Sequence, residues 1–156
     1  MKRQIFLRAS GYVAVALILN GLIFSLGWND TGVTRQATPP WFAPPGWVIG
    51  AIWTLLFAGM GAADVLLSAR LPGAGRARLV GRLLAFDCLA YTFYALATDS
   101  VWAGFAGNIG TVLLAATAAL LARPHDRRAA ALLGLVALWS AYATSIVVYR
   151  LAGAGQ

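Results

Sequence analysis

Five apolar runs, separated by short polar segments, make up most of this chain of 156 residues. They cover about residues 9–28, 47–68, 79–97, 101–121 and 130–151. A helix needs roughly 20 apolar residues to cross the hydrocarbon core of a bilayer, and each run is close to that length. The runs predict an all-α fold, an integral membrane bundle of five transmembrane helices, in a single domain over residues 1–156.

The composition supports a membrane protein and excludes several other classes. Hydrophobic residues make up 60% of the chain and charged residues only 11%. A soluble domain has nearer a quarter charged residues, because its surface faces water, and disordered chains have more still. The single cysteine, Cys88, cannot form an intrachain disulfide, which excludes a disulfide scaffold.

The first apolar run could instead belong to a signal peptide, since Lys2, Arg3 and Arg8 precede it. A signal peptide has an apolar region of about 7 to 15 residues followed by a cleavage site of small residues. The run here is longer, and the sequence from Phe24 to Trp28 is a poor cleavage site. We expect the segment to be retained as a transmembrane helix.

The basic residues predict the orientation of the chain. Ten of the twelve lie at the N-terminus or in the second and fourth connections: Lys2, Arg3, Arg8, Arg70, Arg76, Arg78, Arg82, Arg123, Arg127 and Arg128. By the positive-inside rule, the N-terminus is cytoplasmic and the C-terminus lies outside. The net charge of +7 then reflects topology, and no nucleic-acid partner is expected. Contact with anionic lipid headgroups is an alternative use of the same residues.

The longest outer connection, residues 29–46, contains four of the six prolines: Pro39, Pro40, Pro44 and Pro45. Such a segment is stiff and extended rather than helical. It also carries Trp41 and Phe42. The segment could form a lid or platform over the helical bundle, or its aromatic residues could simply anchor the chain at the membrane interface.

Residues for catalysis or metal binding are scarce. The only histidine, His125, falls in a cytoplasmic loop, where we expect no cavity, and one histidine with one cysteine cannot supply a closed set of metal ligands. No catalytic residues, metal site or covalently bound cofactor are expected. The sequence does not predict an enzyme.

Two aspartates lie within the apolar runs. A charged group at the bilayer centre costs about 2.5 to 3.5 kcal/mol and usually faces the bundle interior or a water-filled cavity. Asp87 is near mid-depth and is the better candidate for function, as a cavity-lining group, an interhelical hydrogen-bonding group or a proton relay. Asp64 is nearer a helix end, and we expect it close to Arg70.

Aromatic and small residues add two further expectations. Flat aromatic faces on the second, third and fifth runs could enclose a planar hydrophobic ligand, although ordinary packing explains any single one of them. Small residues at positions 59 and 61–63 allow helices to approach closely, either within the bundle or between two protomers. A homodimer is therefore one expectation.

Residues 39–57, with the sequence PPWFAPPGWVIGAIWTLLF, carry a family resemblance. The stretch resembles the KPxWxPPxWvFxxvWtxLY pattern of the tryptophan-rich sensory protein (TspO/MBR) family, which includes the mitochondrial translocator protein or peripheral benzodiazepine receptor. The second Pro-Pro pair, Trp47 and the Trp53-Thr54 pair match in register. The family has the same length and five transmembrane helices, so the resemblance implies the same fold.

The resemblance also implies a ligand and a site. Family members bind porphyrins and haem-related tetrapyrroles, sterols and synthetic benzodiazepine-site ligands between the helices, under the first loop. Transferred position by position, the ligand-binding residues would be Phe42, Trp53, Phe86, Asp87, Ala90, Phe93, Trp139 and Ala143. Some members promote light-dependent breakdown of protoporphyrin with two tryptophans, which correspond to Trp53 and Trp139.

The chain departs from the family pattern at several positions of that pocket. Residues that differ from the family are Pro39 (Lys), Phe42 (Trp), Phe57 (Tyr), Asp87 (Asn), Ala90 (Trp), Leu135-Val136 (Pro-Tyr) and Val147 (Asn). The sterol motif near the C-terminus is also missing, because no spacer separates Tyr149 from Arg150. The pocket is therefore altered in shape and polarity.

Three functional hypotheses follow. The first is a membrane receptor or carrier for a planar hydrophobic ligand, a tetrapyrrole bound non-covalently, with a regulatory role in tetrapyrrole or pigment metabolism. The second is an accessory structural subunit of a larger membrane complex, such as a photosynthetic or respiratory one. The third is light-dependent porphyrin degradation. In each case we expect a protein of the bacterial inner (cytoplasmic) membrane, with the lipid bilayer as its first partner.

Overall fold

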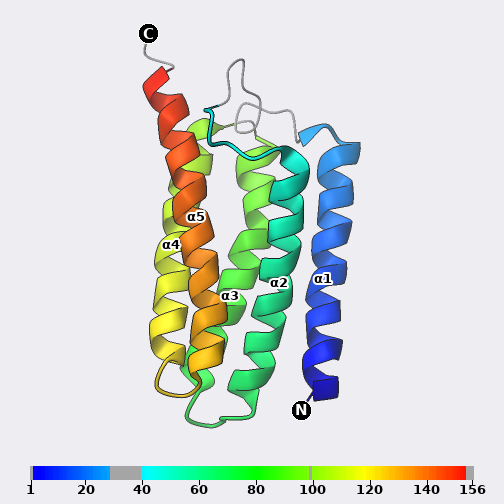
Figure 1. Ribbon diagram of the computed structural model, residues 1–156, viewed down its shortest axis with the longest axis vertical. Coiled ribbons are helices and arrows are strands. Elements are labelled where there is room, and N and C mark those ends of the chain that lie inside the picture. Colours follow the sequence, from blue (N-terminus) through cyan, green and yellow to red (C-terminus); the bar gives the residue numbers. More distant parts are fainter. Residues whose placement is uncertain (1, 29–39, 99, 154–156) are drawn as a thin grey trace.

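The computed structural model describes residues 2–28, 40–98 and 100–153, and these residues form a bundle of long helices (Figure 1). The helices are α1 (Lys2–Ser25), α2 (Gly46–Ser68), α3 (Gly75–Tyr91), α4 (Val101–Ala122) and α5 (Arg127–Gly153), and the π-helical segment η2 (Thr92–Leu96) continues α3. With α3 and η2 taken as one span, the described residues include five helices long and apolar enough to cross a membrane. The predicted fold class is confirmed.

Four of the helices form a closed ring, and the fifth is attached to its side. Neighbours in the ring are α2 and α3, α3 and α4, α4 and α5, and α5 and α2, while α1 packs on α2. The N-terminus lies at one end of the bundle, together with the α2–α3 and α4–α5 connections (Figure 1). We call this end the basic end, and the opposite end, which holds the segment before α2, the loop end.

Three helices begin earlier than the hydropathy predicted. They start at Lys2 instead of residue 9, at Gly75 instead of residue 79, and at Arg127 instead of residue 130. Apolar runs mark only the part of a helix that lies in hydrocarbon, whereas arginine and lysine are themselves good helix formers. The helices therefore continue through their basic first turns toward the headgroup region.

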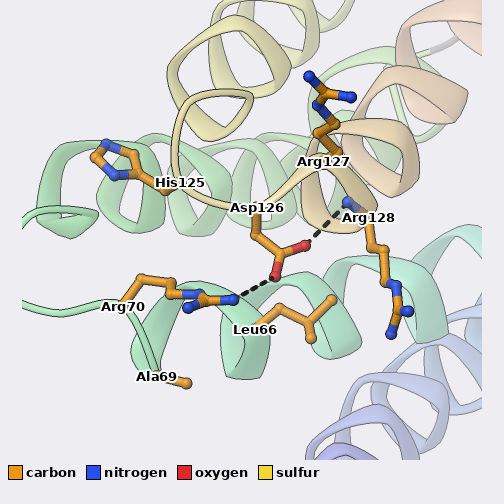
Figure 2. A pocket seen from close by; sticks show the side chains of 7 residues that line it. All are labelled: Leu66, Ala69, Arg70, His125, Asp126, Arg127 and Arg128. Carbon is orange, nitrogen blue, oxygen red and sulfur yellow. Dashed lines mark hydrogen bonds and ion pairs between the residues drawn. The ribbon is translucent and has the colours of Figure 1, made fainter.

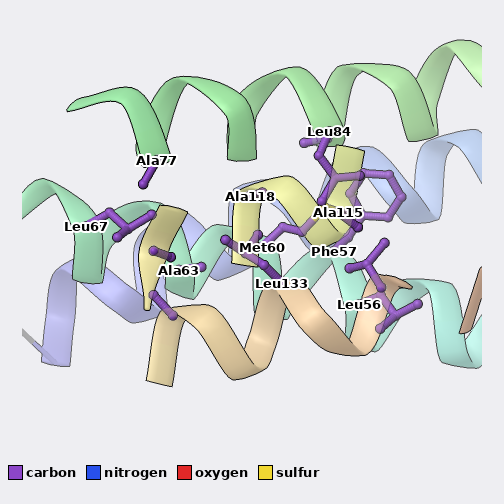
Figure 3. Packing of buried hydrophobic residues seen from close by; sticks show 14 of the residues in the cluster. Leu56, Phe57, Met60, Ala63, Leu67, Ala77, Leu84, Ala115, Ala118 and Leu133 are labelled. Atoms are coloured by element: carbon purple, nitrogen blue, oxygen red, sulfur yellow. The ribbon is translucent and has the colours of Figure 1, made fainter. Parts of the chain in front are cut away.

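Small residues dominate the centre of the ring. On α4, Ala115, Ala118 and Ala122 are fully buried, and they pack in one cluster with larger side chains such as Leu84 of α3 and Leu133 of α5 (Figure 3). Short side chains let helix backbones approach closely, which gives helices in a membrane most of their packing energy. Within α1, only Ala16 is buried.

The glycines of α2 are used for packing between helices. A Cβ atom at Gly61 would lie 3.0 Å from the Ala9 Cα atom and the Arg8 carbonyl oxygen of α1. At Gly59 it would lie 3.4 Å from the Leu132 side chain of α5. Both small residues thus bring helices of the same chain together. The homodimer stays a prediction.

A change in helix type in the third span was not expected from the sequence. In η2, the Ala97 amide donates to the Thr92 carbonyl oxygen at 3.0 Å, five residues back. Short π-helical turns are rare and are frequent at functional sites. The Tyr94 hydroxyl on this segment lies over Gly107 of α4, where a Cβ atom would be only 2.6 Å away. The α3–α4 contact at this level requires glycine.

Candidate functional site

The described part of the proline-rich segment is attached to α5 at the loop end. The Tyr142 hydroxyl donates a hydrogen bond to the Phe42 carbonyl oxygen. The Phe42 ring also meets the rings of Tyr142 and Tyr149 edge-on, with centroids 6.5 and 6.1 Å apart. The residues after position 39 therefore have a fixed place over the end of the bundle. Residues 29–39, where a lid was expected, lie outside the described residues.

Trp139 lies next to this attachment, one helical turn before Tyr142. The two rings are tilted by 35° with centroids 5.3 Å apart. The Trp139 indole Nε1 is buried and has no hydrogen-bond partner among the described residues, and the same holds for the neighbouring Ser140 hydroxyl. Buried polar groups are nearly always hydrogen-bonded in folded proteins. A bound molecule with an acceptor atom would satisfy the indole N–H group.

Trp53 lies on α2, half-buried against the central cluster. Its ring centroid is 6.2 Å from that of Phe57 on the next turn. Trp53 and Trp139 pack against the same buried cluster from α2 and α5, which are neighbours in the ring. This cluster extends through the bundle, and among the described residues the nearest ring neighbours of the two tryptophans are different: Phe57 for Trp53 and Tyr142 for Trp139.

Asp87 forms a second polar group, between α3 and α4. The Thr111 hydroxyl donates to its Oδ2 atom at 2.7 Å and also bonds the Gly107 carbonyl oxygen. Tyr94 interacts with the same carboxyl group from the π-helical segment. These partners are hydroxyl groups, and the structure gives Asp87 no ion pair with any described residue. The interhelical hydrogen bond is one of the three roles considered for Asp87 from the sequence.

The remaining residues of the expected pocket are more dispersed. Phe86 is 70% exposed and Phe93 is 52% exposed, and Phe93 meets Trp28 edge-on at the loop end. Ala90 and Ala143 are half-buried. The structure thus divides the expected set into a group around Trp139 and Phe42, a group around Asp87, and two phenylalanines on the outer surface of the third span.

The structure corrects the expectation for Asp64. Its side chain is only 4% exposed, and its partners are Arg78 and Arg82 of α3 at 2.8 Å and Arg8 of α1 at 3.5 Å. Arg70, the partner expected from sequence proximity, lies 3.9 Å from Asp126 instead. Arg78 and Arg82 are fourteen and eighteen residues from Asp64 along the chain, and such separations do not reveal which helices meet, so this cluster was missed.

A cleft of about 540 Å³ lies at the basic end, between the end of α2 and the start of α5. Figure 2 shows Asp126 in its centre, bonded to Arg70 on one side and to the Arg128 amide on the other. His125 also lines this cleft, so the expectation that it lies away from any cavity was wrong. Asp126 accepts from the Arg128 and Ala129 amides and caps α5.

A family model for the TspO/MBR family matches residues 12–150. The chain belongs to the TspO/MBR family. The match covers most of the chain, from the third turn of α1 into the last turn of α5. For a TspO/MBR protein, five apolar spans and family membership together support an integral membrane protein with a translocator-type role in binding sterols or tetrapyrroles. No curated protein and no solved structure matched the chain.

Proposed function

We propose that this TspO/MBR protein is a membrane receptor or carrier that binds a tetrapyrrole non-covalently near Trp139, under the segment that precedes α2. The observation that carries the proposal is the buried Trp139 Nε1 atom, which has no partner among the described residues. A porphyrin offers a flat apolar ring, which can pack on aromatic side chains, and peripheral carboxylates, which can accept the indole N–H. Family membership supports the same class of ligand.

The aromatic attachment at the loop end suits such a ligand. The contact between Tyr142 and the Phe42 carbonyl oxygen holds the segment close to Trp139, so binding of a ring there would require little further ordering of residues 40–45. Asp87 replaces the asparagine expected from the family pattern, and it supplies an acceptor where the asparagine would also supply a donor. We expect this difference to change which tetrapyrroles bind, because a carboxylate and an amide pair with different polar groups at the edge of the ring.

Titration with protoporphyrin IX tests the proposal, with the porphyrin absorbance as the readout. Trp139→Phe keeps an aromatic ring and removes the N–H group, and we expect it to weaken binding about two- to tenfold, since one hydrogen bond contributes about 0.5–1.5 kcal/mol. Trp102→Phe is the matched control, because Trp102 is 69% exposed on α4. Equal affinities of wild type and Trp139→Phe would refute the assignment of the site.

Illumination of the same complex separates binding from light-dependent breakdown. If Trp53 and Trp139 act in a photochemical reaction, the porphyrin absorbance declines under light in wild type and is stable in a Trp53→Phe, Trp139→Phe double variant. A carrier leaves the absorbance unchanged in both. The experiment uses the purified protein in aerated buffer, because dissolved oxygen supplies the oxidant for the breakdown.

We also propose that the protein lies in a bacterial inner membrane. The positive-inside rule predicts that its basic end faces the cytoplasm. Cys88 is only 6% exposed, so a cysteine introduced elsewhere can be labelled selectively. In intact cells, a membrane-impermeant maleimide should label Trp41→Cys at the loop end and leave Arg123→Cys at the basic end unlabelled. The reverse result would show the opposite orientation.

A further inference from the structure

Four charged side chains from three helices meet at the basic end. The Asp64 carboxylate of α2 accepts from the Nε atoms of Arg78 and Arg82 at 2.8 Å, and Arg8 of α1 lies 3.5 Å from it. We call these four residues the Asp64 cluster. Since α1 and α3 both pack on α2, the three arginines approach the carboxylate from two neighbouring helices (Figure 1).

The cluster has more positive than negative charge. Three guanidinium groups share one carboxylate, and both carboxylate oxygens are engaged, since the Nη2 atoms of Arg78 and Arg82 lie 3.4 Å from Oδ2. An arginine has five N–H donors, so most of the donors in the cluster need other acceptors. Side chains of Arg8 and Arg82 are 53% and 45% exposed. Their remaining donors can therefore reach a molecule outside the protein.

The depth of the cluster places that surface against lipid. Asp64 is four residues from the end of α2 at Ser68, or about 6 Å at 1.5 Å per residue. With the ends of α2 at the headgroups, as the length of the helix predicts, this level is close to the boundary between headgroups and acyl chains, where an arginine in contact with hydrocarbon alone would be costly. An ion pair between the guanidinium group and a phosphate removes that cost. Such pairs are among the strongest hydrogen-bonded pairs in proteins.

The surface next to the cluster is apolar toward the membrane centre. Arg78, Arg82 and Phe86 follow each other at intervals of four residues on α3, and so they share one face of the helix. Phe86 is 70% exposed, and Leu83 beside it is 49% exposed. A molecule with an anionic head at Arg82 and an apolar tail along Phe86 matches this surface, whereas a soluble anion matches only its polar part.

We propose that the Asp64 cluster binds the phosphate of an anionic phospholipid, with Arg8 and Arg82 as the donors and Phe86 in contact with an acyl chain. Asp64 positions the two arginines and does not touch the lipid. The Asp64 cluster contains none of the residues placed around Trp139, which lies near the middle of α5, and the inference does not depend on tetrapyrrole binding. The negative phosphate of the bound lipid thus connects the positive side chain of Arg8 on α1 to that of Arg82 on α3.

Thermal unfolding of the purified protein in a neutral detergent tests the proposal. Phosphatidylglycerol should raise Tm more than phosphatidylcholine, and inorganic phosphate at the same charge concentration should have little effect. Arg8→Gln combined with Arg82→Gln should remove most of that difference between the two lipids. The matched control is Arg3→Gln combined with Arg76→Gln, which removes the same charge from α1 and α3 at exposed positions outside the cluster.

Two results would contradict the proposal. One is the same loss of lipid discrimination in both double variants, which would indicate general attraction between the basic end and anionic membranes. The other is an equal rise in Tm with inorganic phosphate, which would indicate a soluble anion as the occupant.

The single variant Arg8→Gln covers the case in which the double variant does not fold. It leaves Asp64 with both partners at 2.8 Å. Native mass spectrometry then measures the phosphatidylglycerol retained per protein, which should fall several-fold relative to Arg3→Gln. Unchanged retention would exclude the cluster as the binding site.

Discussion

Asp64 and Asp87 are the same residue type inside the same bundle, and their surroundings are opposite. Asp64 lies within three arginines from α1 and α3. Asp87 receives a hydroxyl from Thr111 at 2.7 Å and interacts with Tyr94. Asp64 connects three helices through ion pairs near one end of the bundle. Asp87 connects two helices through hydrogen bonds with hydroxyl groups nearer the middle of its span.

The two aspartates represent two kinds of polar group within the bundle: one that holds the fold together and one that is available to a ligand. A buried charge requires a compensating charge, and removing one partner of a buried ion pair leaves an expensive group behind. A carboxyl group with hydroxyl partners is held less firmly and keeps acceptor capacity for another molecule. We therefore expect substitutions at Asp64 to affect folding and substitutions around Asp87 to affect ligand binding. The variants below test this division in order of decreasing effect on stability.

The largest effect is expected for Asp64→Asn. It leaves three guanidinium groups without their counter-charge, and the loss of one partner of a buried pair costs about 3–5 kcal/mol. Unfolding by sodium dodecyl sulfate in mixed micelles measures the change. A loss below about 1 kcal/mol would show that the arginines are solvated independently of Asp64.

Gly61→Ala should have the next largest effect. The added Cβ atom would lie 3.0 Å from the Arg8 and Ala9 backbone, so α1 must move away from α2 and carry Arg8 away from Asp64. Overpacking of this kind costs about 1–3 kcal/mol. Gly11→Ala is the control, because nothing lies within 4 Å of its Cβ position, and it should be neutral or slightly stabilising in the same unfolding assay.

Thr111→Val removes the hydroxyl donor to Asp87 and keeps the shape of the side chain. Hydrogen bonds between membrane helices contribute about 0.6 kcal/mol on average, and we expect a loss of that size. The same unfolding assay measures it. A loss as large as that of Asp64→Asn would remove the distinction between the two aspartates.

Asp87→Asn should have the smallest effect on stability, below about 0.6 kcal/mol, because the amide oxygen still accepts from Thr111. The substitution restores the residue of the family pattern, so we expect a change in protoporphyrin IX affinity that exceeds the change in stability. Parallel titration and unfolding compare the two quantities. Identical porphyrin affinity with a large loss of stability would assign Asp87 a structural role instead.

The sequence predicted the parts of the fold that depend on local properties. Apolar length located the five spans. The sequence also named Trp139 and Tyr142, whose ring centroids lie 5.3 Å apart, and their role in ligand binding stays a prediction. The sequence did not predict η2, and the close approach of Tyr94 on this segment to Gly107 across the α3–α4 interface cannot be read from either segment alone.

The basic end shows most clearly what the sequence determined and what the tertiary structure decided. Hydropathy and charge are read one segment at a time, and they determined which residues lie in the membrane and which end of the bundle is basic. Partners across helices depend on where backbones approach. The contact at Gly61 brings Arg8 to Asp64, and Arg70 is left to Asp126 despite its nearness to Asp64 along the chain. Only the packed bundle decided which aspartate is held by arginines and which faces hydroxyl groups.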